Sequence, residues 1–161
     1  MKRTTSHRFA ICGFTLLEVM IALVIFSIGL LGLAGLQARG LQSNSAAHYR
    51  TVAAILAYDM ADRLRSNPTG VSNGAYNALT VAPGAAPAPN CVTAACTPDE
   101  QAAYDYYEWT TQAANQLPSG HGTVTGAGAQ FTIIVMWNED RTANANQNCN
   151  ELTCYQLVVE P

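Results

Sequence analysis

Residues 19–36 read VMIALVIFSIGLLGLAGL, and this stretch decides the fold of the 161-residue chain. It holds eighteen residues without a charge, about the length of apolar helix that crosses a lipid bilayer. The segment before it carries Lys2, Arg3 and Arg8, so the positive-inside rule predicts a cytoplasmic N-terminus and an exported remainder. We expect a single span over residues 14–36, followed by one exported domain.

The apolar segment continues into an amphipathic stretch, residues 37–67, without a proline or a turn cluster between them. We predict one long helix that ends at Asn67, because the residue before Pro68 is pushed out of the helical region. The second half of this helix has a stripe of mostly apolar side chains at three- and four-residue spacing, which needs a partner surface. The members of the stripe are Leu41, Ser45, Tyr49, Val52, Leu56, Met60 and Leu64.

Residues 68–161 form the exported head. Residues 71–90 are rich in Gly, Ala, Pro and Asn and predict a surface loop with at most a short strand around residues 76–81. Thr97, Pro98 and Glu100 then supply an N-cap, a first-position proline and a capping box, which predict a helix over about residues 98–117. The aromatic and apolar side chains of this helix, expected in the core, are Tyr104, Tyr107, Trp109 and Leu117.

The last third of the chain changes to a β period. Three segments rich in β-branched and aromatic residues, 122–125, 130–138 and 153–160, predict a three-stranded antiparallel meander. One face of the middle strand, with Phe131, Ile133, Val135 and Trp137, can cover the amphipathic part of the long helix. The expected fold class is α+β: a long N-terminal helix, membrane anchor and spine, packed on a small antiparallel sheet with a second short helix.

Four of the five cysteines fall in the exported part as two C-x4-C pairs, Cys91 with Cys96 and Cys149 with Cys154. An even count in an exported domain favours disulfides. We favour the two local bridges, because short loops bring their thiols together at low entropic cost. Crossed pairings and a four-thiolate zinc site are the alternatives, and the zinc site is disfavoured because zinc knuckles usually have C-x2-C spacing. Cys12 lies apart, in the leader.

The charge and motif content of the head argue against several function classes. Beyond Pro68 there is one base, Arg141, against eight acidic residues, which we expect on the solvated surface, so the head should not bind nucleic acid through its phosphates. The only lysine is Lys2, and neither His48 nor His121 has a second histidine nearby in the sequence. Common catalytic and phosphate-binding motifs are missing, so we expect no enzyme activity, no cofactor, no metal and no small-molecule substrate.

Glu18 is the most informative single residue. A carboxylate near the start of a membrane span costs several kcal/mol unless it is neutralised or paired, which makes it a functional candidate. The alternative is that Glu18 lies at the depth of the lipid headgroups. Its setting favours the first interpretation, because a basic leader ending in Gly13 precedes it and the uninterrupted apolar run follows.

Gly13, Phe14 and Glu18 together resemble the signature of the type IV prepilin family: a short basic leader, a glycine at the cut site, phenylalanine after it and glutamate as the fifth mature residue. The resemblance implies that a prepilin peptidase removes residues 1–13 by cleavage after Gly13, and that the amino group of Phe14 is methylated. It also implies that Glu18 pairs with the amino terminus of a neighbouring subunit during assembly.

Four further segments resemble the PilV-type minor pilins: LLEVMIALVIFSIGLLGLAGLQ, AYDMADRLRSNP, AAYDYYEW and FTIIVMWNE. This resemblance implies a minor subunit that initiates or modifies a type IV pilus together with other minor and major pilins. It would be anchored in the inner membrane by a single pass, with a periplasmic head, and would later enter the fibre or its tip. The alternatives are a type II secretion pseudopilin and a membrane-anchored adhesin or binding module.

Overall fold

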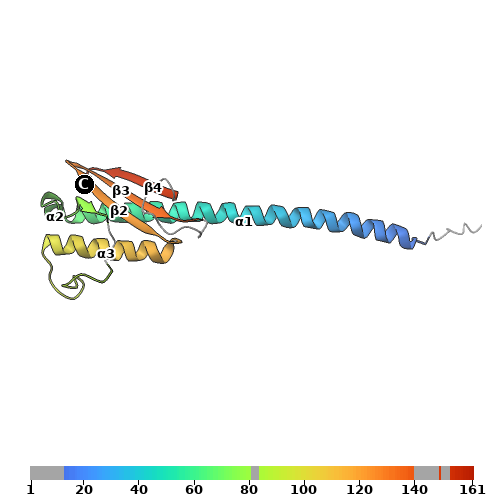
Figure 1. Ribbon diagram of the computed structural model, residues 1–161, viewed down its shortest axis with the longest axis horizontal. Helices are drawn as coiled ribbons and strands as arrows, with labels where there is room; N and C mark the ends of the chain where they lie inside the picture. The colour runs from blue at the N-terminus through green and yellow to red at the C-terminus, as the bar shows by residue number, and fades with distance from the viewer. Residues whose placement is uncertain (1–12, 81–83, 140–148, 150–152) are drawn as a thin grey trace, which may run out of the picture. The chain divides into compact units, whose positions relative to one another are not determined.

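The structure is a computed structural model that describes residues 13–80, 84–139, 149 and 153–161 (Figure 1). It divides into two compact units, residues 1–43 and residues 44–161, which are described separately here. The first helix, α1 (Leu16–Ser66), contributes to both units.

The N-terminal unit, in its described part, is the first half of α1 preceded by three non-helical residues. Helix α1 begins after Thr15, whose side-chain Oγ1 accepts a hydrogen bond from the Glu18 N–H at 3.3 Å, as an N-cap residue does. All residues from 13 to 43 are exposed. The segment is long and apolar enough to cross a membrane, and none of it is buried inside the protein. Its apolar side chains therefore find no partners among the described residues.

The second unit is the head. Besides the end of α1 it contains α2 (Pro68–Ser72), β1 (Ala78–Leu79), α3 (Pro98–Gln116), β2 (His121–Ala127), β3 (Gln130–Trp137) and β4 (Thr153–Val159). The strands form one antiparallel sheet in the order β1-β2-β3-β4. Within this unit, α3 runs alongside α1, and the sheet packs over the helices (Figure 1). The architecture is the α+β arrangement that the sequence predicts.

One hydrophobic core joins these elements. From α1 it includes Leu56, Met60 and Leu64, which confirms the C-terminal part of the predicted stripe. The prediction is wrong for the first two members of the stripe, because Leu41 is 69% exposed and Ser45 is exposed as well. Alanines take a share of the buried face instead, because their small side chains let neighbouring elements approach the α1 backbone closely. The alanines are Ala53, Ala57 and Ala61.

Helix α3 packs against this alanine-rich face through Trp109. The indole is fully buried, and its Nε1 donates a hydrogen bond to the Leu56 carbonyl oxygen at 2.7 Å. A buried indole N–H needs such an acceptor, and here the acceptor belongs to α1. Tyr104 and Leu117 are also buried, as predicted, whereas Tyr107 is only half-buried.

The start of α3 follows the predicted capping box. Thr97 Oγ1 accepts from the Glu100 N–H at 3.3 Å, and the Glu100 carboxylate accepts from the Thr97 N–H at 2.8 Å. The Glu100 carboxylate accepts from the Thr97 N–H and also from the Thr97 hydroxyl, and these two hydrogen bonds lower the pKa of Glu100, because they favour its charged form.

The sheet has the three strands predicted for the last third of the chain, and the short strand β1 lies within residues 76–81, where the sequence predicts at most a short strand. The four predicted core side chains of β3, Phe131 to Trp137 at alternate positions, are all buried. Strand β1 has two residues and pairs Ala78 with Thr125 and Leu79 with Val124. It extends the edge because the Gly126 N–H donates to the Asn77 carbonyl at 2.9 Å, which holds the preceding loop beside β2. The short helix α2, directly after the end of α1, was not expected.

Candidate functional site

The described residues hold two features that could act in assembly: the start of α1 in the N-terminal unit, and a polar cluster between α1 and α3 in the head. At the start of α1, Glu18, Ala22 and Phe26 follow one another at four-residue spacing and so share a helix face, and Phe14 lies just before the helix. Together with Val19 and Leu23 they line a shallow groove of about 570 Å³. Glu18 is the only charged residue in this lining.

Glu18 lies in the first turn of α1, where the helix dipole favours a negative charge. Its backbone N–H is taken up by Thr15. The carboxylate is exposed, and no described residue forms an ion pair with it. The site therefore offers an unpaired acid at the edge of an apolar face, which a cationic group from another molecule could neutralise.

Gly13 and Phe14 precede the helix and are exposed. A Cβ added at Gly13 would meet nothing within 4 Å, so the local structure does not itself require a glycine there. A requirement for glycine would have to come from a molecule that acts on this peptide bond. Cleavage after Gly13 and methylation of Phe14 stay predictions at this point.

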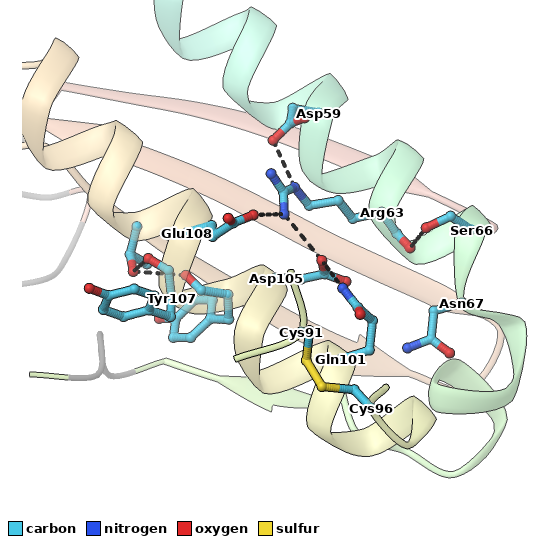
Figure 2. Close-up of polar contacts among 12 residues, drawn as sticks. Asp59, Arg63, Ser66, Asn67, Cys91, Cys96, Gln101, Asp105, Tyr107 and Glu108 are labelled. Carbon is cyan, nitrogen blue, oxygen red and sulfur yellow. Dashed lines mark hydrogen bonds and ion pairs between the residues drawn. A yellow bond between two sulfur atoms is a disulfide. The ribbon is translucent and has the colours of Figure 1, made fainter. Parts of the chain in front are cut away.

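The polar cluster of the head centres on Arg63 of α1 (Figure 2). Its Nε donates to Asp59 at 3.0 Å, and its Nη1 donates to Asp105 and Glu108 of α3, both at 3.1 Å. We call these four residues the Arg63 cluster. The Arg63 side chain is only 18% exposed and that of Asp105 only 6%. One guanidinium thus joins two helices through three carboxylates.

Asp105 also connects the cluster to the rest of the head. Its Oδ1 accepts from Gln101 Nε2 at 2.9 Å, and its Oδ2 accepts from the Tyr76 hydroxyl at 2.7 Å. The Tyr76 hydroxyl in turn accepts from Asn67 Nδ2 at 3.2 Å, at the junction of α1 and α2. A buried carboxylate with this many donors is well satisfied, and it fixes α1, α3 and the loop after α2 relative to one another.

Two members of this network, Arg63 and Tyr76, have shifted pKa values. Burial acts to lower the pKa of Arg63, but hydrogen bonds to Glu108 and Asp59 outweigh it, so the pKa is raised. Burial, followed by the hydrogen bond to Asp105, raises the pKa of Tyr76, which therefore stays protonated and keeps donating. Near neutral pH, Arg63 is therefore charged and Tyr76 neutral, and both donate to Asp105.

This network was not predicted from the sequence. Every acid of the head was expected at the surface, which is wrong for Asp105, 4% exposed. One signal was available: Asp105 lies four residues after Gln101 and four before Trp109, and therefore on the side of α3 that carries the buried indole.

The structure contains two disulfides, Cys91–Cys96 and Cys149–Cys154, with Cα–Cα distances of 5.5 and 5.6 Å. The first bridge closes the loop just before the N-cap of α3, and the second ties Cys149 to β4. Cys12 lies outside the described residues. Across residues 13–80, 84–139, 149 and 153–161, no group of three or more His, Cys, Asp or Glu side chains could hold a metal ion.

His121 is another buried titratable group of the head. It begins β2, is 8% exposed, and its Nε2 has no hydrogen-bond partner among the described residues. Burial lowers its pKa, more than the hydrogen bond to the Thr80 backbone raises it. The side chain is therefore neutral at neutral pH.

Two family models match the chain. The model described as prokaryotic N-terminal methylation motif matches residues 8–34, which include Gly13, Phe14 and Glu18. The model described as type IV pilin Tt1218 matches residues 35–107, which include Arg63 and Asp105. Comparison with curated proteins and with solved structures gives no match.

These matches carry consequences for the whole molecule. Type IV pilins are structural proteins and not enzymes, and the methylation motif implies processing by a prepilin peptidase and assembly with other pilins. The apolar first half of α1, together with this motif, anchors the chain in a membrane before its incorporation into a pilus. The chain is a type IV prepilin-like protein with a pilin role in a type IV pilus or a related system.

Proposed function

We propose that this chain is a minor pilin of the PilV type, which takes part in initiating or modifying a type IV pilus. The observation that carries the proposal is the Arg63–Asp105 contact. It joins AYDMADRLRSNP to AAYDYYEW, two of the segments through which the sequence resembles PilV-type proteins. The resemblance therefore falls on residues that hold the head together, in addition to the N-terminal motif that all prepilins share.

The proposed processing follows from the N-terminal motif. The prepilin peptidase removes residues 1–13 on the cytoplasmic side, and Phe14 becomes the methylated first residue. Residues 14–36 then span the inner membrane once, residues 37–67 form the spine, and residues 68–161 complete a periplasmic head. On assembly, Glu18 pairs with the amino terminus of a neighbouring pilin, because an unpaired charge in an apolar bundle is costly.

Two other functions would use the same anchor. A type II secretion pseudopilin shares the leader and Glu18, and the paired cysteines and the size of the head favour the pilus. A membrane-anchored adhesin would use the described parts of the loop over residues 71–90 and the tyrosines of α3 as its ligand surface. The rigid contacts that bind α3 to α1 favour a structural role for that helix.

The test is a deletion strain complemented with the wild-type chain or with Gly13→Ser. Gly84→Ser is the matched control, because a Cβ at either glycine meets nothing within 4 Å. We expect deletion and Gly13→Ser to lower the number of surface pili, and wild type and Gly84→Ser to restore it. Sheared pili should contain far fewer copies of this chain than of the major pilin.

Other outcomes would contradict the proposal. Normal pili with a block in protein secretion would identify a pseudopilin. Normal pili and normal secretion, with loss of binding to a surface, would identify an adhesin.

A further inference from the structure

The head exposes few large apolar side chains. Among the described residues from 44 onward, those of Ile55, Tyr58, Val92 and Val158 are exposed, and only Ile55 and Tyr58 lie close together in the sequence. They are three residues apart on α1 and therefore neighbours on the helix surface. Ile55 is 62% exposed and Tyr58 is 55% exposed.

Acidic side chains border this apolar pair. Asp59 lies one turn after Ile55 and Asp62 one turn after Tyr58, so each acid neighbours an exposed apolar residue. Glu108 of α3 reaches the same edge of α1, because it shares Arg63 with Asp59. We define the outer α1 surface as Ile55, Tyr58, Asp59, Asp62 and Glu108.

The charge of this surface is negative. Its three carboxylates, those of Asp59, Asp62 and Glu108, pair with two guanidinium groups, Arg63 and Arg65. The Arg63 side chain is 18% exposed, whereas those of Asp59, Glu108 and Asp62 are 40%, 36% and 76% exposed. The Arg65 side chain is 49% exposed and pairs with Asp62, so the surface carries three acids against two bases, of which only Arg65 is well exposed.

We infer that the outer α1 surface docks another pilin subunit, through a segment of that subunit that carries Lys or Arg beside apolar side chains. An aromatic and an aliphatic side chain with a charged rim is the usual composition of a protein interface. The acid excess selects a basic partner and disfavours anionic lipid headgroups and nucleic acid. The inference rests on the proposed function for the class of the partner.

Two structural features support this occupant. The surface lies on α1, and the first half of α1 carries the pilin assembly motif. The surface is also held rigid, because Arg63 donates hydrogen bonds to Asp59 and Glu108. Arg63 is itself held by Asp105, which also accepts hydrogen bonds from Gln101 and Tyr76. A rigid surface loses less conformational entropy on binding.

The experiment replaces Tyr58 with the photoreactive residue p-benzoylphenylalanine in the full-length chain, expressed in its own host. Val158 is the matched control position, because it is 51% exposed and lies on β4, away from α1. We expect irradiation to crosslink the photoreactive residue at position 58, but not the one at position 158, to a protein whose sequence begins with its own prepilin motif. Mass spectrometry should place the crosslink beside Lys or Arg residues of that protein.

Charge reversal tests the acidic part. Asp62→Lys should lower the crosslink yield at position 58 about tenfold, which corresponds to ~1.4 kcal/mol of binding free energy. Glu160→Lys makes the same change of net charge at the exposed end of the chain and should leave the yield unchanged. Both acids are exposed, so neither change should unfold the head.

Several results would overturn the inference: a crosslink to lipid, to a second copy of this chain or to a protein without a prepilin start, or a yield that Asp62→Lys does not change. The same photoreactive residue at Phe26 separates this failure from failure of the proposed function. If Phe26 captures pilins and Tyr58 does not, the minor-pilin proposal stands and the docking surface is wrong. If neither position captures a pilin, both are wrong.

Discussion

The two parts of α1 differ in where their apolar side chains find partners. From residue 16 to residue 43 every side chain of the helix is exposed. From residue 53 to residue 64 the same helix buries a face of leucine, methionine and alanine in the core of the head. A change in the first part should therefore alter assembly and leave the head folded, whereas a change in the second part should alter the stability of the head.

The largest expected effect belongs to Glu18→Gln. If Glu18 pairs with an amino terminus in the assembled fibre, its loss leaves that cation unpaired at a cost of about 3 kcal/mol, or roughly a hundredfold in incorporation. Quantitative immunoblotting of sheared pili and of membranes measures this ratio. Ser27→Ala, an uncharged exposed change in the same part of α1, should leave incorporation unchanged.

Both variants should unfold at the same denaturant concentration as the wild type, because neither residue contacts the core of the head. A loss of head stability in Glu18→Gln would contradict the separation of the two parts.

The next largest effect concerns Asp105→Ala. This change removes a buried carboxylate that accepts hydrogen bonds from Arg63, Gln101 and Tyr76, and it should lower the free energy of unfolding by about 3 kcal/mol. Urea unfolding of the detergent-solubilised chain, followed by the fluorescence of the buried Trp109 and Trp137, measures it. Asp62→Ala breaks only an exposed pair with Arg65 and should cost no more than about 0.5 kcal/mol.

A smaller effect is expected for Gly122→Ala. A Cβ at Gly122 would collide with the six-membered ring of Trp109, which packs directly on the β2 backbone. Neither the strand nor the buried indole can move easily, so overpacking should cost about 2 kcal/mol in the same unfolding experiment. Gly84→Ala meets no atom within 4 Å and should behave as wild type; equal stability of both variants would show that the indole can shift.

The smallest effect is the pH dependence of His121. Its pKa in the folded head is lower than its ordinary value of 6.5, mainly through burial, so the unfolded chain binds a proton more readily. The free energy of unfolding should therefore fall as the pH drops below about 6.5. His121→Gln, which does not titrate, should show a shallower decline between about pH 7 and pH 5. Identical slopes for the variant and the wild type would contradict this assignment.

The difference between the two parts of α1 also explains what could be predicted from sequence. The membrane segment, the cap at Thr97 and the core face of β3 each depend on a local pattern, and each is as expected. The burial of Asp105 depends on Arg63, 42 residues earlier, and no local pattern contains that contact. Strand β1 lies within residues 76–81, where the sequence predicts at most a short strand, but two residues are too few for a pattern to show its pairing with β2.

The wrong prediction for the first residues of the stripe also arises because a local pattern does not show long-range contacts. Leu41 continues the three- and four-residue spacing of Leu56, Met60 and Leu64, and periodicity alone cannot show where the covering partner ends. The described core includes α1 residues from Tyr49 onward. The spacing identified the helix face correctly and overestimated how much of it the head covers.

The measurement that tests the central claim most directly is the intact mass and N-terminal sequence of the chain, extracted from membranes and pili of its own host. A strain without the prepilin peptidase is the comparison. We predict a chain that begins at methylated Phe14 when the peptidase is present and at Met1 when it is absent. A chain that begins at Met1 in both strains, or that is cut after Leu36, would contradict the account.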